Sequence, residues 1–389
     1  MPGRPLSALL SQVLVAFTLE FDNEFEKRMN GSGHPGIALS MAVWNHVLRF
    51  LAEGPVAVRE LTKRALLPES QIKMQLGCLE RWRFVTLQAG AGETVMLQRD
   101  GWGSGRGIRA GWLAGLTPRG RAAVDVWPPL AGEIERRWRE RFGADDIARI
   151  RQSLEDIACR FDRELPHSLP GGFDTVHDSP ARTAHPAGSL SLPVLLSQVL
   201  LAFTIDFDAQ SRTPLRLCAG TIRVLGEEPV PVSDIPRLTG SSPETSDIGW
   251  QLKPYVALAA AAQGTRGKVA RLTPLGLHAQ QTYCDLTGAI EKRWSEKFGG
   301  EELQRLRVAL LDLFVPRSGE RLLLAEGLIP HEGTTRSGAQ GPALGRRDVG
   351  SAALQRARDM VAQSEQFQRD PAGSLPHYPQ WDMNRGFGP

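Results

Sequence analysis

Residues 51–85, LAEGPVAVRELTKRALLPESQIKMQLGCLERWRFV, contain the start and stop signals of two short helices. Gly54-Pro55 ends a preceding helix that we expect over 38–51, because proline cannot continue a helix. A short helix is predicted over 58–65. Pro68-Glu69-Ser70 then opens the next helix, since proline is favoured at the first helical position.

This next helix has one apolar face, and a strand pair follows it. Three residues share the spacing that turns a side chain toward the core: Ile72, Leu76 and Leu79. The runs 84–87 and 94–98, separated by Gly90 and Gly92, predict a β-hairpin. Three short helices followed by a two-stranded wing are typical of the winged helix-turn-helix, whose third helix enters the major groove of DNA.

Longer helices flank this unit. An apolar residue at every fourth position predicts a long N-terminal helix: Leu9, Val13, Phe17, Phe21 and Phe25. After the hairpin, Pro118 opens a helix that runs to Phe142, and Ala144-Asp145-Asp146 starts a last helix that ends near Arg160. The macrodipole favours carboxylates in a first turn, so these aspartates are interpreted as structural. The fold class is therefore mainly α with small β wings.

The same order of elements occurs twice in the chain. Segment 9–22, LLSQVLVAFTLEFD, returns as 195–208, LLSQVLLAFTIDFD, with 11 of 14 positions identical. Segment 116–143 returns as 272–299, with Trp138 matching Trp294. Self-similarity of this kind indicates a tandem repeat.

The repeats differ in length, because the offset is 186 residues at the first block and 156 at the second. We therefore divide the chain into a first repeat over 1–165, a linker over 166–193 and a shortened second repeat over 194–315. A loop-rich extension over 316–389 follows, with one further helix expected at 352–369. Its Leu-Pro-His at 375–377 repeats the one at 165–167.

The composition points to a cytoplasmic protein without metal or cofactor. The longest apolar runs are too short to span a membrane, and the first residues do not resemble a secretory signal. The four cysteines lie far apart and the eight histidines are scattered, so no zinc or disulfide pattern is present in the sequence. A net charge of +3 is only mildly basic, so any argument for nucleic acid depends on where the charge lies.

The charge is concentrated in the first repeat. Residues 59–121 contain 11 basic and 5 acidic residues, a net of +6, whereas residues 223–276 contain 6 and 5, a net of +1. Neutralising phosphates supplies most non-specific affinity for DNA, so the first repeat is expected to dominate binding.

The candidate DNA contacts of the first repeat lie on the predicted third helix and the wing. With the apolar face inward, the outer face would read bases with Ser70, Gln71, Lys73, Met74 and Gly77. Further contacts are expected from Arg81, Arg99, Arg106 and Arg109. The alternative is that these polar residues form an ordinary solvated helix face.

The second repeat is expected to bind DNA weakly and to act mainly by pairing with the first. Pro254 interrupts its third helix, and its wing is cut to 263–268. Its weaker candidate contacts are Thr245, Ser246, Lys253, Arg266 and Lys268.

Residues 51–85, together with LTPRGR at 116–121, resemble the multiple-antibiotic-resistance regulator (MarR) family. QRDGWGSGRGIRAGW at 98–112 and LPHYP at 375–379 resemble a duplicated, single-chain group of such regulators from actinobacteria. The resemblance implies a DNA-binding transcriptional regulator rather than an enzyme, with double-stranded DNA as partner. It leaves open release by a small-molecule effector bound between the winged units and the helical interface.

Regulators of this type pair through their flanking helices, and here both sets lie on one chain. The simplest hypothesis is a monomer that acts as a pseudo-dimer, in which Leu10, Phe17 and Phe21 pack with Leu196, Phe203 and Phe207. The alternatives are that these side chains fill only each repeat's own core, and that the chain forms a homodimer.

Two other interpretations stay open at the level of sequence. Cys78 lies on the third helix, where an oxidant-sensing thiol is an alternative to an apolar filler. The whole chain is alternatively an interaction module that binds a protein partner without recognising a DNA sequence. The glycine-rich loop at 101–107 fits neither common nucleotide-binding pattern.

Overall fold

The computed structural model describes residues 3–34, 47–89, 93–95, 107–167, 190–241, 251–261, 267–315, 323–328, 366 and 369–379. Within this part the chain is mainly helical, and its strands form two small antiparallel sheets. The predicted α+β class is confirmed at this level. No helix among the described residues is long and apolar enough to cross a bilayer.

The first repeat begins with one long helix and ends with two others: α1 (Leu6–Gly31), α5 (Pro118–Phe142) and α6 (Ala144–Ala158). Between them lie the short helices η1 (Arg49–Leu51), α3 (Val58–Ala65) and α4 (Glu69–Arg81). A four-stranded sheet of order β1-β4-β2-β3 completes the unit: β1 (Val56–Ala57), β2 (Val85–Ala89), β3 (Glu93–Val95) and β4 (Leu113–Leu116).

The second repeat has the same frame, with α7 (Leu192–Asp208), α10 (Pro274–Phe298) and α11 (Gly300–Asp312) as its long helices. Its short helical elements are α8 (Leu215–Leu217), η2 (Cys218–Ile222), η3 (Val232–Asp234) and α9 (Ile235–Thr239). A three-stranded sheet of order β5-β7-β6 contains β5 (Val230–Pro231), β6 (Val256–Ala260) and β7 (Lys268–Leu272).

Helices α5 and α10 start in the same way, which explains the repeated Leu-Thr-Pro-x-Gly. The hydroxyl of Thr117 accepts a hydrogen bond from the amide of Gly120 at 3.0 Å, and Thr273 accepts from Gly276 at 3.2 Å. A Cβ on Gly120 would lie 2.0 Å from the carbonyl oxygen of Phe84, and one on Gly276 would lie 2.2 Å from the equivalent oxygen. Glycine is therefore required at both positions by close packing.

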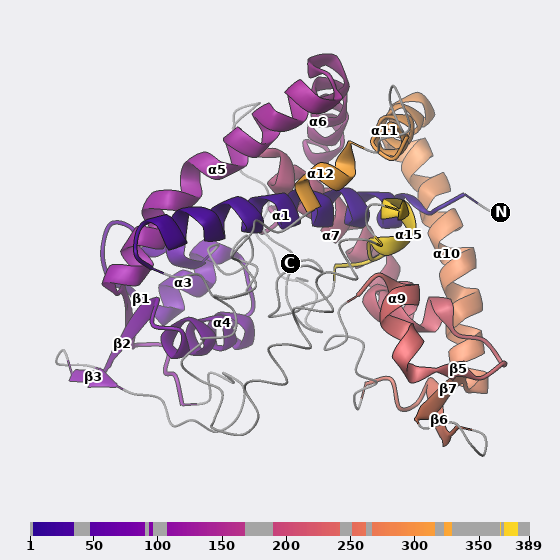
Figure 1. Cartoon of the computed structure of the whole chain (residues 1–389), viewed down its shortest axis with the longest axis horizontal. Coiled ribbons are helices and arrows are strands. Elements are labelled where there is room, and N and C mark those ends of the chain that lie inside the picture. The colour runs from indigo at the N-terminus through magenta and orange to yellow at the C-terminus, as the bar shows by residue number, and fades with distance from the viewer. Residues whose placement is uncertain are drawn as a thin grey trace.

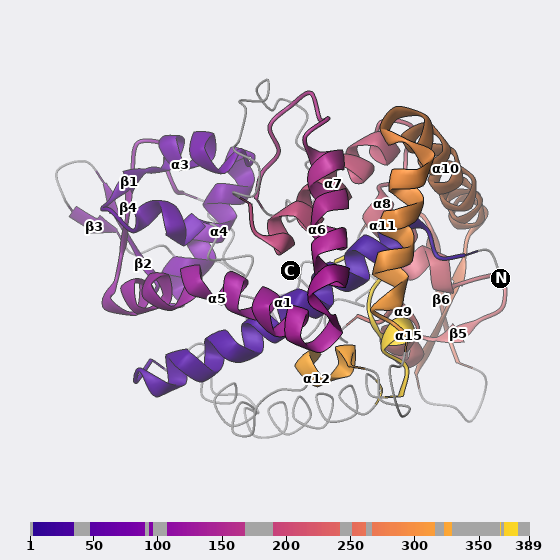
Figure 2. The same ribbon diagram turned by 90° about the horizontal axis from the view of Figure 1, so that it is seen from above.

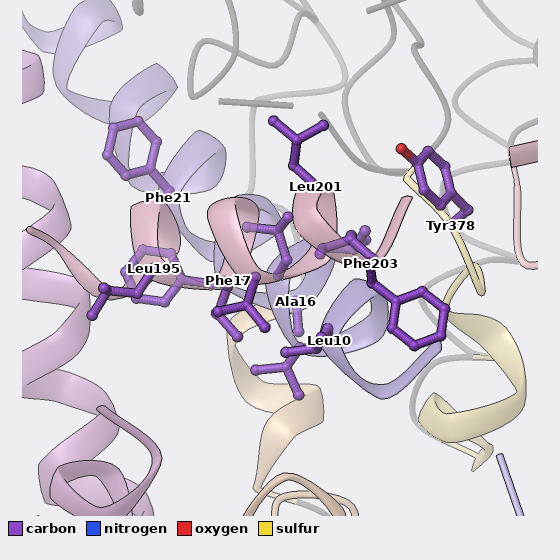
Figure 3. Packing of buried hydrophobic residues seen from close by; sticks show 14 of the residues in the cluster. Leu10, Ala16, Phe17, Phe21, Leu195, Leu201, Phe203 and Tyr378 are labelled. Carbon is purple, nitrogen blue, oxygen red and sulfur yellow. The ribbon is translucent and has the colours of Figure 1, made fainter. Parts of the chain in front are cut away.

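The core joins the two repeats, because α1 and α7 pack against each other. Figure 3 shows Leu10 and Phe17 of α1 gathered in one cluster with Leu195 and Phe203 of α7. All four side chains are at most 2% exposed. Helices α1 and α7 thus share one core within the chain.

Each repeat also uses its own aromatic residues to attach the long C-terminal helix to the first one. The rings of Phe17 and Trp138 lie 5.2 Å apart, and those of Phe203 and Trp294 lie 5.3 Å apart. In Figure 2, α6 and α11 lie side by side across the junction of the repeats. The aromatic residues therefore fill the core of their own repeat and also contribute to the core that joins the repeats.

The Leu-Pro-His elements cross from one repeat to the other. Gln12 of α1 donates to the carbonyl oxygen of Leu375 at 2.9 Å, and Gln198 of α7 donates to that of Leu165 at 2.9 Å. The first helix of each repeat is thus held by the segment that follows the other repeat. Tyr378, next to the second element, is buried and accepts a hydrogen bond from Thr204 at 3.3 Å.

The two sheets lie at opposite ends of the molecule and on the same side of α1 (Figure 1). The long helices form the bridge between them. Any partner that contacts both sheet regions must therefore span the molecule along α1.

Several expectations need correction. Strands β1 and β4 were not expected, and β4 pairs with both β1 and β2. The described residues of the extension include two short helices that were not expected, α12 (Leu324–Leu328) and α15 (Pro371–Ser374). Helix α7 starts at Leu192, inside the expected linker. Most of the helix expected at 352–369 lies outside the described residues.

Candidate nucleic-acid interface

Helices α3 and α4 form a compact pair beside the four-stranded sheet. Their connection is short, and Leu66 takes a left-handed conformation with φ of 55° to reverse the chain. The amide of Arg59 donates to the carbonyl oxygen of Ala110 at 2.9 Å, which places the start of α3 beside the segment that leads into β4. The predicted helices at 58–65 and from Pro68 are confirmed.

The apolar face of α4 is confirmed, but its expected outer face is only partly open. Ile72, Leu76 and Leu79 are each 0% exposed. Gln71, however, is only 3% exposed and Gly77 is buried, so the expectation that both face outward is wrong. A helix period identifies one inward direction, and it does not reveal a second contact on the flank.

The flank of α4 that carries Gln71 also carries Gln75, and both amides are buried. Neither amide makes a hydrogen bond with any residue that the structure describes, although each has both donors and an acceptor. An unsatisfied buried polar group costs about 1–3 kcal/mol. In this conformation Gln71 cannot reach a base edge.

The remaining predicted base readers are accessible to different degrees. Ser70 is exposed, while Met74 and Arg81 are half-buried. The ammonium of Lys73 lies 2.6 Å from the carboxylate of Glu69, one turn earlier. An exposed i,i+4 pair is weak, so Lys73 can exchange this partner for a phosphate at little cost.

Exposed cations surround the α3–α4 unit. Five of them are exposed and have no ion pair with any described residue: Arg59, Lys63, Arg83, Arg109 and Arg121. Arg119 lies nearby over the ring of Phe84, 4.6 Å from its centroid. Burial lowers the pKa of Arg119, and the neighbouring charge of Arg83 lowers it further, which indicates that these cations lie close together. Of these residues, the sequence alone pointed individually only to Arg109.

Arg83 occupies a position that favours glycine. Its φ is 61°, in the left-handed region, at the turn between α4 and β2. A residue with a side chain pays about 1 kcal/mol for this conformation relative to glycine. An exposed arginine is thus kept at a site where glycine would be more stable.

Among the described residues of 223–276 in the second repeat, four exposed cations have no ion pair with a described residue: Arg237, Lys253, Lys268 and Arg271. Lys253 is exposed in a turn at 251–255 and not in a helix, in agreement with the expected effect of Pro254. Lys268 is exposed at the start of β7. The remaining candidates of both repeats lie outside the described residues: Arg99, Arg106, Thr245, Ser246 and Arg266.

Cys78 does not have the properties of a reactive thiol. It is 1% exposed, and burial raises its pKa to about 12. The thiolate is the reactive form, so this environment suppresses reaction with oxidants. In the described part of the chain, no three side chains of the metal-binding types lie together.

No model of a protein family, no curated protein and no solved structure matches the chain.

Proposed function

We propose that the chain is a DNA-binding transcriptional regulator of the MarR type, in which the first repeat is the main DNA reader. Its α3, α4 and sheet would form a winged helix-turn-helix, with β2 and β3 as the base of the wing. The observation that carries this proposal is the set of exposed, unpaired cations around α3 and α4. Cations of this kind are available to phosphates without breaking an existing ion pair.

The packing of α1 against α7 supports a tandem pair of winged units that acts as a single-chain pseudo-dimer. Both sheets lie on the same side of the bridge formed by the long helices (Figure 1). This is the arrangement in which two units can contact one face of a duplex. The lower charge of the second repeat makes it the weaker contact.

Binding to the DNA upstream of the chain's own gene, measured by fluorescence anisotropy over a salt series, tests the proposal. We expect Arg59→Ala and Arg109→Ala each to weaken binding and to reduce the slope of log K against log salt by about 1. Arg293→Ala is the matched control, because Arg293 is an exposed arginine on α10, a helix that lies at the opposite end of the molecule from α3 and α4 (Figure 1). The control should leave the slope unchanged.

Arg83→Gly separates charge from folding. The substitution relieves a left-handed arginine and should raise the stability of the fold by about 1 kcal/mol, while weakening DNA binding. A loss of affinity in a more stable protein cannot come from unfolding. If no salt-dependent binding is found, or if all three arginine variants bind like the wild type, the chain is better described as an interaction module for a protein partner. The buried flank of α4 at Gln71 is the observation that favours this second function.

A further inference from the structure

A cavity of about 180 Å³ opens where the end of the first repeat meets α7 and α10. Its lining combines three aromatic rings, Phe161, Trp294 and Phe298, with four charged side chains: Asp162, Arg163, Asp206 and Lys297. The ring of Phe161 lies 6.4 Å from that of Trp294 and 6.1 Å from that of Phe298. Since a dry cavity of about 150 Å³ binds benzene, this one has room for a molecule with a single ring.

The equivalent place in the first repeat is filled. Trp138 donates its indole N–H to the carboxylate of Glu20 at 2.9 Å, and Arg141 donates two hydrogen bonds of 2.9 Å to the two oxygens of the same carboxylate. Helix α12 closes over this pair, with Glu326 3.6 Å from the guanidinium of Arg141. A Cβ on Gly327 would lie 2.1 Å from Glu20, so no space remains.

The second repeat keeps the carboxylate but not its cation. Trp294 donates its indole N–H to Asp206 at 2.7 Å, as Trp138 does to Glu20. Lys297 stands where the first repeat has Arg141, but its ammonium lies 4.0 Å from Asp162 and 5.3 Å from the centre of the Phe298 ring. No cation of a described residue is within ion-pair distance of Asp206.

The lengths and shapes of the two pairs of side chains explain why the second repeat lacks this ion pair. Aspartate is one methylene shorter than glutamate, and lysine ends in a point charge where arginine has a planar fork that can bind both oxygens. The two changes, from Glu20 to Asp206 and from Arg141 to Lys297, pull the carboxylate and the cation apart. What remains is a cavity with three aromatic rings and the carboxylate of Asp206 in its wall, and no described cation pairs with that carboxylate, although Arg163 and Lys297 line the same cavity.

We propose that this cavity binds a small organic cation with one aromatic ring, an arylalkylamine. The ammonium occupies the position that the guanidinium of Arg141 has in the first repeat and pairs with Asp206. The ring packs against Phe161 and Trp294, whose faces also attract the positive charge. Lys297 remains 4.0 Å from Asp162 and 5.3 Å from the centre of the Phe298 ring.

Isothermal titration of the full chain with phenethylamine tests this proposal and does not depend on DNA binding. We expect saturable binding with a Kd below about 10 mM, the weak limit that ligand efficiency gives for a ligand of this size. Its acidic analogue, 3-phenylpropanoate, should bind more weakly than phenethylamine, because its carboxylate would meet Asp206, and Arg163 and Lys297 in the same lining would compensate only in part.

Two variants locate the site. Asp206→Asn keeps the shape and removes the charge, and we expect it to weaken binding about 10-fold or more, as the loss of a charged partner typically does. The double variant D206E/K297R rebuilds the ion pair of the first repeat, fills the cavity and should also weaken binding about 10-fold or more. Asp125→Asn, at an exposed acid on α5, is the matched control and should bind like the wild type.

Urea unfolding of each variant confirms that it is folded. The proposal is overturned if phenethylamine shows no saturation, if 3-phenylpropanoate binds equally well, or if Asp206→Asn retains the affinity of the wild type.

Discussion

The buried carboxylate of Glu20 should stabilise the fold more than its counterpart Asp206. Glu20→Gln keeps the size of the side chain and its acceptor for Trp138, but it removes the negative charge under the guanidinium of Arg141. The side chains of Glu20 and Arg141 are 6% and 14% exposed, so water cannot replace the lost partner fully. Breaking a buried pair costs about 3–5 kcal/mol, and Glu326 at 3.6 Å offsets part of it, so we expect a loss of about 2–3 kcal/mol.

The matched change in the second repeat removes no ion pair. Asp206→Asn keeps an oxygen that accepts from the indole of Trp294, and the structure places no described cation against Asp206. Only the extra strength of a charged hydrogen bond is lost, so we expect about 0.5–1 kcal/mol. The two variants should therefore differ by about 1–2.5 kcal/mol although the chemical change is the same.

Urea unfolding followed by tryptophan fluorescence and circular dichroism measures the difference. Because one hydrophobic core runs through both repeats, we expect a single transition with the same slope in each variant. Glu140→Gln is the control for an exposed pair, since Arg136 and Glu140 are 59% and 62% exposed, and it should change stability by less than about 0.5 kcal/mol. Equal losses for Glu20→Gln and Asp206→Asn would refute the idea that the two repeats use this carboxylate differently.

Three further changes test other parts of the structure. Gly120→Ala should cost about 2 kcal/mol or more in urea unfolding, because its Cβ would meet a backbone carbonyl, whereas Gly132→Ala, with open space around it in α5, should gain about 0.5–1 kcal/mol. A thiol reagent should modify exposed Cys159 rapidly and leave Cys78 unmodified until the chain unfolds, and fast labelling of Cys78 would contradict the burial that raises its pKa to about 12. Burial lowers the pKa of His377 to about 3, so between this value and the ordinary histidine pKa of about 6.5 the unfolded chain binds the proton preferentially. From pH 7.5 to pH 5.5 the wild type should therefore lose about 1 kcal/mol more stability than His377→Gln. Parallel profiles of stability against pH for the two proteins would contradict this reasoning.

The long helices are the part of the fold that the sequence predicts best. Helix α5 runs from Pro118 to Phe142 as expected, because its signals are local: a threonine cap, a proline in the first turn and a glycine at the end. Helix α3 was also predicted to the residue. These signals act within a few residues, so no tertiary information is needed to read them.

Elements that depend on distant partners were missed for the same reason. Strand β4, Leu113–Leu116, has no β-branched residue and exists because β1 and β2 pair with it on both sides. Helix α12 has five residues and is too short to be stable alone, but its Leu324 and Leu328 are buried against the rest of the chain. The burial of Gln71 likewise depends on neighbours that the helix period does not specify.

The cavity beside Asp206 was partly predictable, because the two residue differences that create it are visible when the sequences of the repeats are aligned. The aligned blocks show Glu20 opposite Asp206 and Arg141 opposite Lys297, and both substitutions look conservative in charge. Their consequence depends on reach, which becomes visible only when the distances in the two repeats are compared. A conserved sign of charge was not enough to conserve the ion pair.

The two repeats are constrained in different ways. In both, packing between α1 and α7 and the indole–carboxylate contact hold the long helices, so the shared scaffold restricts what either copy can change. Outside that scaffold the first repeat carries the higher net charge, and Arg141 and α12 close over its carboxylate. The second repeat has a lower net charge, and its carboxylate lines a cavity that also touches Phe161 and Leu165 of the first. A ligand there contacts both repeats at once, so any preference of the ligand for one arrangement of the repeats would also shift the spacing of the two sheet regions.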